Sequence, residues 1–157
     1  RSLTHFASNA YAVISALSLQ LGDEGMPVQP DAVRGDYARA FGLWRRGDRQ
    51  ALVAARSILE RLLAERGALP VVQSLLVRVK ADLVLGHVGD AALAREARQE
   101  AERLVAAHPD IGEVHYSLAR ALLALGRREA ALDELRIAQR TMPFLSRDVA
   151  AIERAAP

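Results

Sequence analysis

The sequence predicts an all-helical protein built from three consecutive helical hairpins. The apolar fraction of the 157 residues is 51% and is dominated by alanine, whereas aromatic residues make up only 4%. β-branched and aromatic residues are too few for a sheet protein. Prolines and glycines recur at regular intervals and indicate a repeat. Prolines at positions 30, 70, 109 and 143 are spaced by 40, 39 and 34 residues. A glycine follows each of the first three prolines at a similar offset. Proline suits the start of a helix and glycine its end.

Residues 1–29 are expected to form an N-terminal capping helix and a linker. Residues 6–21 carry no charge, and Phe6, Val13, Leu17 and Leu21 share one helical face. This segment is shorter than the about 20 residues needed to cross a bilayer, so no membrane span is expected. Residues 22–29 contain two glycines and a proline, which is typical of a linker.

The first hairpin is predicted over residues 30–69. Its first helix begins at Pro30, and Gly47 marks the turn to its second helix. Asp48 follows that glycine and can cap the exposed amides of the second helix. Leu52, Ala55 and Leu59 then recur at helical spacing and predict the buried face.

The second and third hairpins are predicted over residues 70–108 and 109–143, followed by a capping helix in 144–157. Gly86 and Gly126 mark their turns, and Asp90 can cap the helix that follows the first of these turns. Ser146 is a suitable N-cap for the last helix. Such terminal helices would cover the faces that end repeats leave bare.

The third hairpin resembles a tetratricopeptide repeat (TPR), whose pattern of about 34 residues is W-x2-L-G-x2-Y, then A-x3-F, then P. The matching positions are His115, Leu118, Ala119, Leu122, Ala131, Leu135, Ala138 and Pro143, with Gly126 at the turn and Gly47 and Gly86 at the equivalent turns. Histidine replaces the tryptophan and leucine replaces both aromatics. The first two hairpins have longer periods, so a related helical-hairpin solenoid is the alternative.

This resemblance implies a right-handed solenoid of about three repeats whose first helices line a concave groove. The side chains that the resemblance places in the groove are Tyr37, Phe41, Trp44, Glu113, Tyr116 and Arg120. Large rigid rings provide contact area at little entropic cost, which suits binding of a peptide or helix. The alternative is that the three rings of the first hairpin belong to the core or lie beneath the N-terminal helix.

Arginines gather near two of the predicted turns. They are Arg45, Arg46 and Arg49 in the first hairpin and Arg127 and Arg128 in the third. Stacking of the hairpins would align them as a basic edge that could meet phosphates or an acidic protein, and a solvated edge is the alternative. The net charge is only +2, so nucleic acid is not the expected partner.

The sequence predicts no enzyme, metal or cofactor. There is no cysteine, the four histidines lack ligand spacing, and neither a glycine-rich phosphate loop nor a nucleophile elbow occurs. The expected function is therefore that of a TPR-like scaffold or adaptor that binds another protein or a peptide.

The alternative function is a TPR-like regulatory domain of a bacterial transcription regulator or signalling protein, because the segments GLWRRGD and ADLVLG are similar to parts of such domains. Small-molecule binding between the rings is a third possibility. Twenty arginines against one lysine, together with the many alanines, are typical of a GC-rich genome, and a bacterial source is expected. Partner identity, oligomeric state and compartment, whether cytoplasm or periplasm, stay open.

Overall fold

The computed structural model describes residues 30–155, and this part of the chain is all-helical, as predicted. No strand occurs in residues 30–155. The elements, in order, are α2 (Pro30–Arg46), α3 (Arg49–Arg66), α4 (Pro70–Leu85), α5 (Ala91–Ala107), α6 (Gly112–Ala124), α7 (Arg128–Gln139), the 3-10 turn η1 (Pro143–Leu145) and α8 (Ser146–Arg154). The capping helix and linker expected in residues 1–29 lie outside the described residues.

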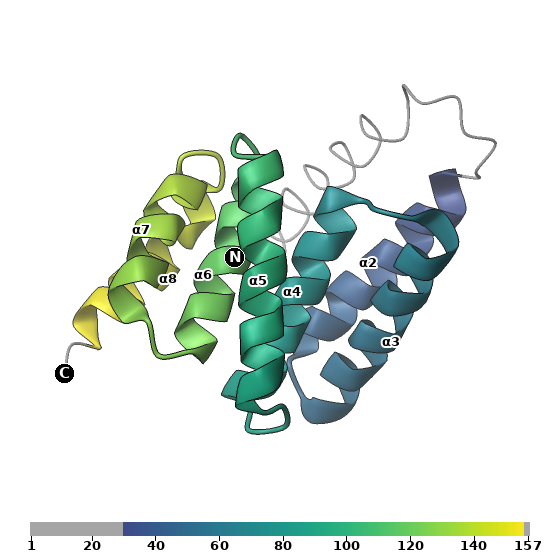
Figure 1. Cartoon of the computed structure of the whole chain (residues 1–157), viewed down its shortest axis with the longest axis horizontal. Coiled ribbons are helices and arrows are strands. Elements are labelled where there is room, and N and C mark those ends of the chain that lie inside the picture. Colours follow the sequence, from purple (N-terminus) through teal and green to yellow (C-terminus); the bar gives the residue numbers. More distant parts are fainter. Residues whose placement is uncertain (1–29, 156–157) are drawn as a thin grey trace.

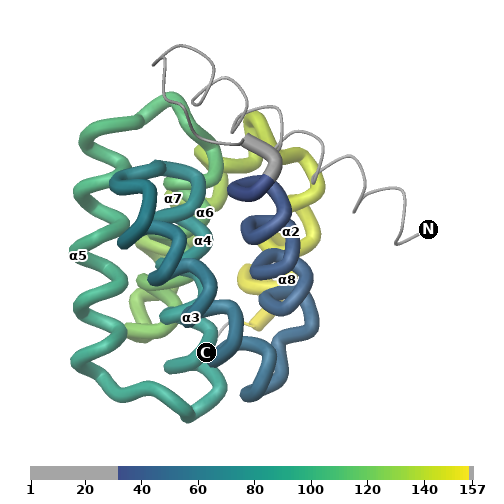
Figure 2. Tube along the Cα trace, turned by 90° about the vertical axis from the view of Figure 1, so that its right-hand side faces the viewer, coloured from purple at the N-terminus to yellow at the C-terminus, as the bar shows by residue number. Residues whose placement is uncertain are grey.

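Neighbouring helices pack in pairs, and the pairs follow one another along the molecule (Figure 1). α2 packs on α3, α4 on α5 and α6 on α7, while α3 also contacts α4 and α5 contacts α6. α4 further contacts both α2 and α6, whereas no close packing joins α3, α5 and α7 to one another within residues 30–155. We therefore call α2, α4 and α6 the inner helices and α3, α5 and α7 the outer helices. Figure 2 shows α5 on one side of the molecule and α2 and α8 on the opposite side.

Local signals explain most helix ends. Asp48 and Asp90 cap α3 and α5 as predicted, because their side chains accept hydrogen bonds from Ala51 N (3.2 Å) and Leu93 N (2.9 Å). Gly47 and Gly126 adopt φ angles of 73° and 72°, the left-handed region that glycine enters without steric cost.

One predicted helix boundary differs from the structure, and one turn glycine, which ends its helix as predicted, differs in conformation. Gly86 has a φ of −84°, and the left-handed residue of this longer turn is His87, with a φ of 60°. Ser146 is the first residue of α8 and not its N-cap, because η1 runs directly into the helix. Its hydroxyl donates to the carbonyl of Pro143 (2.9 Å) instead of accepting from an amide. The prediction of Ser146 as an N-cap is therefore wrong.

α4 lies at the centre of the described core. From Val71 to Leu83 every residue of α4 is buried except Gln73 and Asp82, which are half-buried. A helix that is buried on all sides is typical of the interior of a domain. The core extends from Val33 in α2 to Val149 in α8.

His115 fills the position at which the TPR pattern has tryptophan, and its ring is buried in α6. Its Nδ1 lies 2.7 Å from Glu134 Oε2 on α7, and its Nε2 lies 2.7 Å from the carbonyl oxygen of Pro109. Both ring nitrogens therefore face acceptor oxygens, and a ring that carries a proton on each nitrogen donates to both. The contact to Pro109 also fixes the turn that precedes α6.

Candidate functional site

Aromatic and charged side chains from the three inner helices meet in one cluster. We call this group the inner cluster, and it consists of Tyr37, Phe41 and Trp44 from α2, Arg78 and Asp82 from α4, and Tyr116 and Arg120 from α6. The cluster contains five of the six groove residues that the TPR resemblance suggested. The sixth, Glu113, is half-buried on α6.

The rings of the inner cluster are packed against one another. Ring centroids lie 6.2 Å apart for Tyr37 and Phe41, 5.4 Å for Phe41 and Trp44, and 6.3 Å for Trp44 and Tyr116. All four residues are buried, with Trp44 and Tyr116 each 8% exposed. This burial favours the core alternative over an open groove lined by rings.

The rings also explain how α2 meets the other inner helices. The backbones of α2 and α4 approach at few points, whereas α4 and α6 pack extensively. Large side chains hold helix axes apart and fill the space between them, whereas small residues let axes approach. The rings of α2 therefore explain how the first hairpin packs on the inner helices through large side chains and not through close backbone contacts.

Asp82 connects the first hairpin to the third. Its carboxylate accepts a hydrogen bond from Trp44 Nε1 (2.8 Å) and from Arg120 Nε (3.0 Å), and Arg120 Nη2 also contacts the same oxygen. Burial disfavours the charged form of Arg120, but the Asp82 carboxylate together with Tyr116 and Asp148 outweighs that effect, so the pKa of Arg120 is raised. The middle hairpin thus supplies one carboxylate that accepts hydrogen bonds from the first hairpin and from the third.

Arg78 lies one helical turn before Asp82, and its side chain is buried against two rings. Its guanidinium carbon is 4.6 Å from the centroid of Trp44 and 5.1 Å from that of Tyr116. The residue is 1% exposed. Its Nε and Nη2 atoms are buried and form no well-aligned hydrogen bond among the described residues, and the Tyr37 hydroxyl lies close enough to interact with this guanidinium.

The hydroxyl of Tyr37 and the carboxyl groups of Glu113 and Asp148 interact electrostatically with one another or with arginines near the inner cluster. Burial raises the pKa of Tyr37 to about 12, the charge of Arg78 opposes this rise, and the charge of Glu113 adds to it. Burial also raises the pKa of Asp148 on α8, which the charges of Arg120 and Arg45 oppose. The charges of Arg45 on α2 and Arg120 on α6 therefore act on Asp148 of α8.

Sequence reasoning missed Arg78 and Asp82, although a signal for both exists. They stand with Lys80 in the otherwise uncharged segment of α4 that runs from Val71 to Leu85. Charged residues are rarely fully buried unless they are paired, so charges inside such a segment indicate a polar cluster. Lys80 is explained in this way, because its Nζ lies 3.0 Å from Glu100 Oε1 and 3.5 Å from Glu96 Oε1 on α5.

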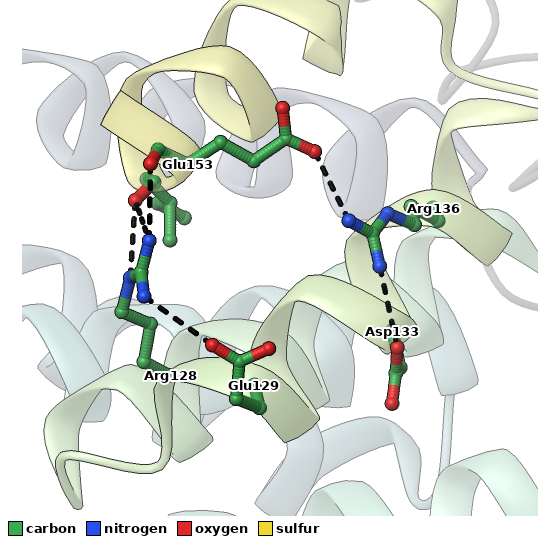
Figure 3. Close-up of polar contacts among 6 residues, drawn as sticks. Arg128, Glu129, Asp133, Arg136 and Glu153 are labelled. Atoms are coloured by element: carbon green, nitrogen blue, oxygen red, sulfur yellow. Dashed lines mark hydrogen bonds and ion pairs between the residues drawn. The ribbon is translucent and has the colours of Figure 1, made fainter. Parts of the chain in front are cut away.

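The predicted basic edge is only partly a free surface. Arg49 and Arg127 are exposed, whereas Arg46 pairs with Asp48 (3.3 Å) and the charge of Arg45 acts on Asp148. Arg128 donates from Nε and Nη2 to the carbonyl oxygen of Ile152 (3.1 and 2.7 Å), at the end of α8 (Figure 3). Three of the five arginines therefore act on groups of this chain.

Replacing Arg128 by alanine is expected to loosen α8, because a cation at a helix C-terminus satisfies unpaired carbonyls and the helix dipole. We expect a loss of about 1 kcal/mol in the free energy of unfolding and faster amide exchange in α8, measured by hydrogen–deuterium exchange. Arg127→Ala removes the same charge from the exposed neighbour and should leave exchange in α8 unchanged. Equal exchange in the two variants would contradict the capping role.

Two open cavities of about 420 Å³ each lie away from the inner cluster. One lies between α3, α4 and α5 and is lined by Leu63, Leu76 and Leu104 among others, and the other lies beside the turn between α4 and α5.

Within residues 30–155, no group of three histidine or acidic side chains is placed to hold a metal ion. No helix in this range has the length and apolar character needed to cross a bilayer.

The chain matches no protein-family model, no curated protein and no solved structure. The resemblance to TPR proteins therefore rests on the sequence pattern alone, which is clearest in residues 112–143 and looser in 30–109.

Proposed function

We propose that this protein is a non-catalytic interaction module of TPR type, which binds a segment of another protein through its inner helices. The arrangement of helices supports this proposal. Paired helices follow one another, and in residues 30–155 the first helices of neighbouring pairs pack on each other, whereas the second helices show no close packing among themselves. Stacked hairpins in which one set of helices lies closer together than the other form a curved array, and such arrays present extended binding surfaces.

The inner cluster is the observation that carries the proposal. Charged side chains of the outer helices include pairs within one helix, such as Arg56 with Glu60 (2.8 Å) and Arg98 with Glu102 (2.9 Å). Such pairs are typical of a solvated surface. Asp82 of the inner cluster instead joins different hairpins, and Arg78 and Tyr37 beside it keep buried polar atoms unpaired within the described part of the chain, as Arg66 on the outer helix α3 also does. Convergent polar and aromatic groups of this kind are typical of binding sites.

Site-specific photo-crosslinking in the bacterial host tests this proposal. A photoreactive amino acid at Arg45, on the inner helix α2, is expected to capture a partner protein, whereas the same amino acid at Glu102, on the outer helix α5, is expected to capture none. Both side chains are exposed, so both variants should fold. Capture of the same proteins from both positions, or of no protein from Arg45, would contradict binding through the inner helices.

A further inference from the structure

The open cavity between α3, α4 and α5, which we call the outer hollow, has an apolar floor. Its volume of about 420 Å³ lies within the range of small-molecule sites, about 300–1,000 Å³. Leu76 and Leu104 line it and are 5% and 6% exposed, and the half-buried Leu63 lies beside them. An apolar ligand that covers such a floor removes apolar surface from water, which is favourable.

The packing of the outer helices leaves this space open. α3 and α5 each pack on α4, but no close packing joins α3 to α5 in the described part of the chain. Ala68, which follows α3, and Ala107, the last residue of α5, also line the outer hollow. Their small side chains leave its volume unfilled. The outer hollow therefore results from the packing of three helices, and none of its lining residues belongs to the inner cluster.

Three unpartnered hydrogen-bond donors line the outer hollow. They are the side chains of Gln73 in the first turn of α4, Arg103 on α5 and His108 directly after α5. Within residues 30–155, none of these three side chains forms a hydrogen bond or an ion pair. Each can donate an N–H bond, and the guanidinium of Arg103 can only donate.

Acceptor groups beside the outer hollow are already bound. Glu100, the carboxylate that lines it, accepts hydrogen bonds from Lys80 Nζ at 3.0 and 3.2 Å. The carbonyl oxygens of Leu63 and Leu104 accept from the amides that end α3 and α5, both at 2.8 Å. The unpaired donors therefore call for a ligand that brings its own acceptors. A carboxylate matches best, because arginine binds it through two parallel N–H bonds.

We propose that the outer hollow is a binding site for a small amphipathic carboxylic acid, such as a medium-chain fatty acid. The alkyl chain covers the leucine floor, and the carboxylate accepts hydrogen bonds from Arg103. His108 and Gln73 supply further donors. This site lies apart from the inner cluster, so the inference goes beyond the proposed function and does not depend on it.

Titration of the full chain with sodium octanoate, below its micelle concentration, tests the site. Leucine methyl groups are labelled and followed by NMR. We expect saturable shifts at Leu63, Leu76 and Leu104, with a dissociation constant below about 1 mM. Octan-1-ol has the chain without the charge and should bind at least about tenfold more weakly, and acetate has the charge without the chain and should shift none of the three. Equal affinity for octan-1-ol would overturn the carboxylate assignment, and no saturable shift with octanoate would overturn the site.

Replacing Ala107 by phenylalanine is expected to fill the outer hollow and weaken octanoate binding at least about tenfold. The neighbouring Ala106 is also exposed but does not line the hollow. Ala106→Phe is therefore the matched control and should leave the affinity unchanged. Because both alanines are exposed, both variants should fold, which far-UV circular dichroism checks. Equal octanoate affinity in the two variants would contradict binding in the hollow.

Replacing Arg103 by methionine keeps an apolar stem and removes the charge, so octanoate should bind at least about tenfold more weakly. Arg95→Met removes the same charge from another exposed position on α5 and should leave binding intact. Unchanged affinity in the Arg103 variant would overturn the proposed head-group contact. Crosslinking from Arg45 reports separately on the proposed function, since it concerns the inner helices and needs no octanoate.

Discussion

Replacing Trp44 by alanine is expected to lower the free energy of unfolding by about 3–5 kcal/mol. The indole is buried and packs against the rings of Phe41 and Tyr116, with centroid distances of 5.4 and 6.3 Å. Its removal leaves a cavity where the backbones of α2 and α4 approach at few points, so the remaining side chains cannot close it easily. The variant also removes one of the two rings that cover Arg78.

Chemical denaturation followed by circular dichroism measures this loss. Trp44→Phe is the matched control, because it retains an aromatic ring and loses the hydrogen bond from Nε1 to Asp82 (2.8 Å). We expect that variant to lose about 1–2 kcal/mol. A loss below about 1 kcal/mol in the alanine variant would show that the indole is not part of the packed core. Because the alanine variant is expected to be unstable, its failure to bind a partner would not by itself identify a binding surface.

Replacing Asp82 by alanine is expected to destabilise the protein by about 3 kcal/mol, the lower end of the range for breaking a buried charge pair. Trp44 Nε1 would lose its acceptor and Arg120 its counter-charge. The lower end applies because the side chains of Asp82 and Arg120 remain 18% and 28% exposed. Urea denaturation of the purified variant measures the change.

Asp133→Ala is the matched control for this variant. Its carboxylate also contacts an arginine, Arg136 (3.5 Å), but is 75% exposed, so its removal should cost less than about 0.5 kcal/mol. Combining Asp82→Ala with Trp44→Phe should reveal a coupling energy of about 1 kcal/mol. Additive losses would mean that the hydrogen bond between the two side chains contributes nothing to stability.

The order and limits of most helices could be predicted from sequence because they depend on local chemistry. Pro30 and Pro70 begin helices, while Asp48 and Asp90 cap them. These signals act within one turn of the chain and need no knowledge of distant segments. Aliphatic spacing likewise predicted the buried faces, including Leu52, Ala55 and Leu59 on α3.

The candidate site could be predicted only in part, because spacing identifies the residues that share a helix face but not what covers that face. Tyr37, Phe41 and Trp44 share a face as expected, yet that face is buried. The partners of Asp82 lie 38 residues away in each direction. Contacts of this kind appear only when the hairpins are stacked, so the role of Asp82 and the burial of Arg78 against two rings became visible in the structure.

The contact between Trp44 and Tyr116 joins the first hairpin directly to the third, and this affects how the protein unfolds. In a linear array each unit interacts only with its nearest neighbours, so end units can melt separately. Here the loss of the first hairpin would remove a ring and a hydrogen-bond donor from groups shared with the third. The three hairpins are therefore thermodynamically linked as one cooperative block, and a shortened chain that lacks either end should not keep the stability of the remainder.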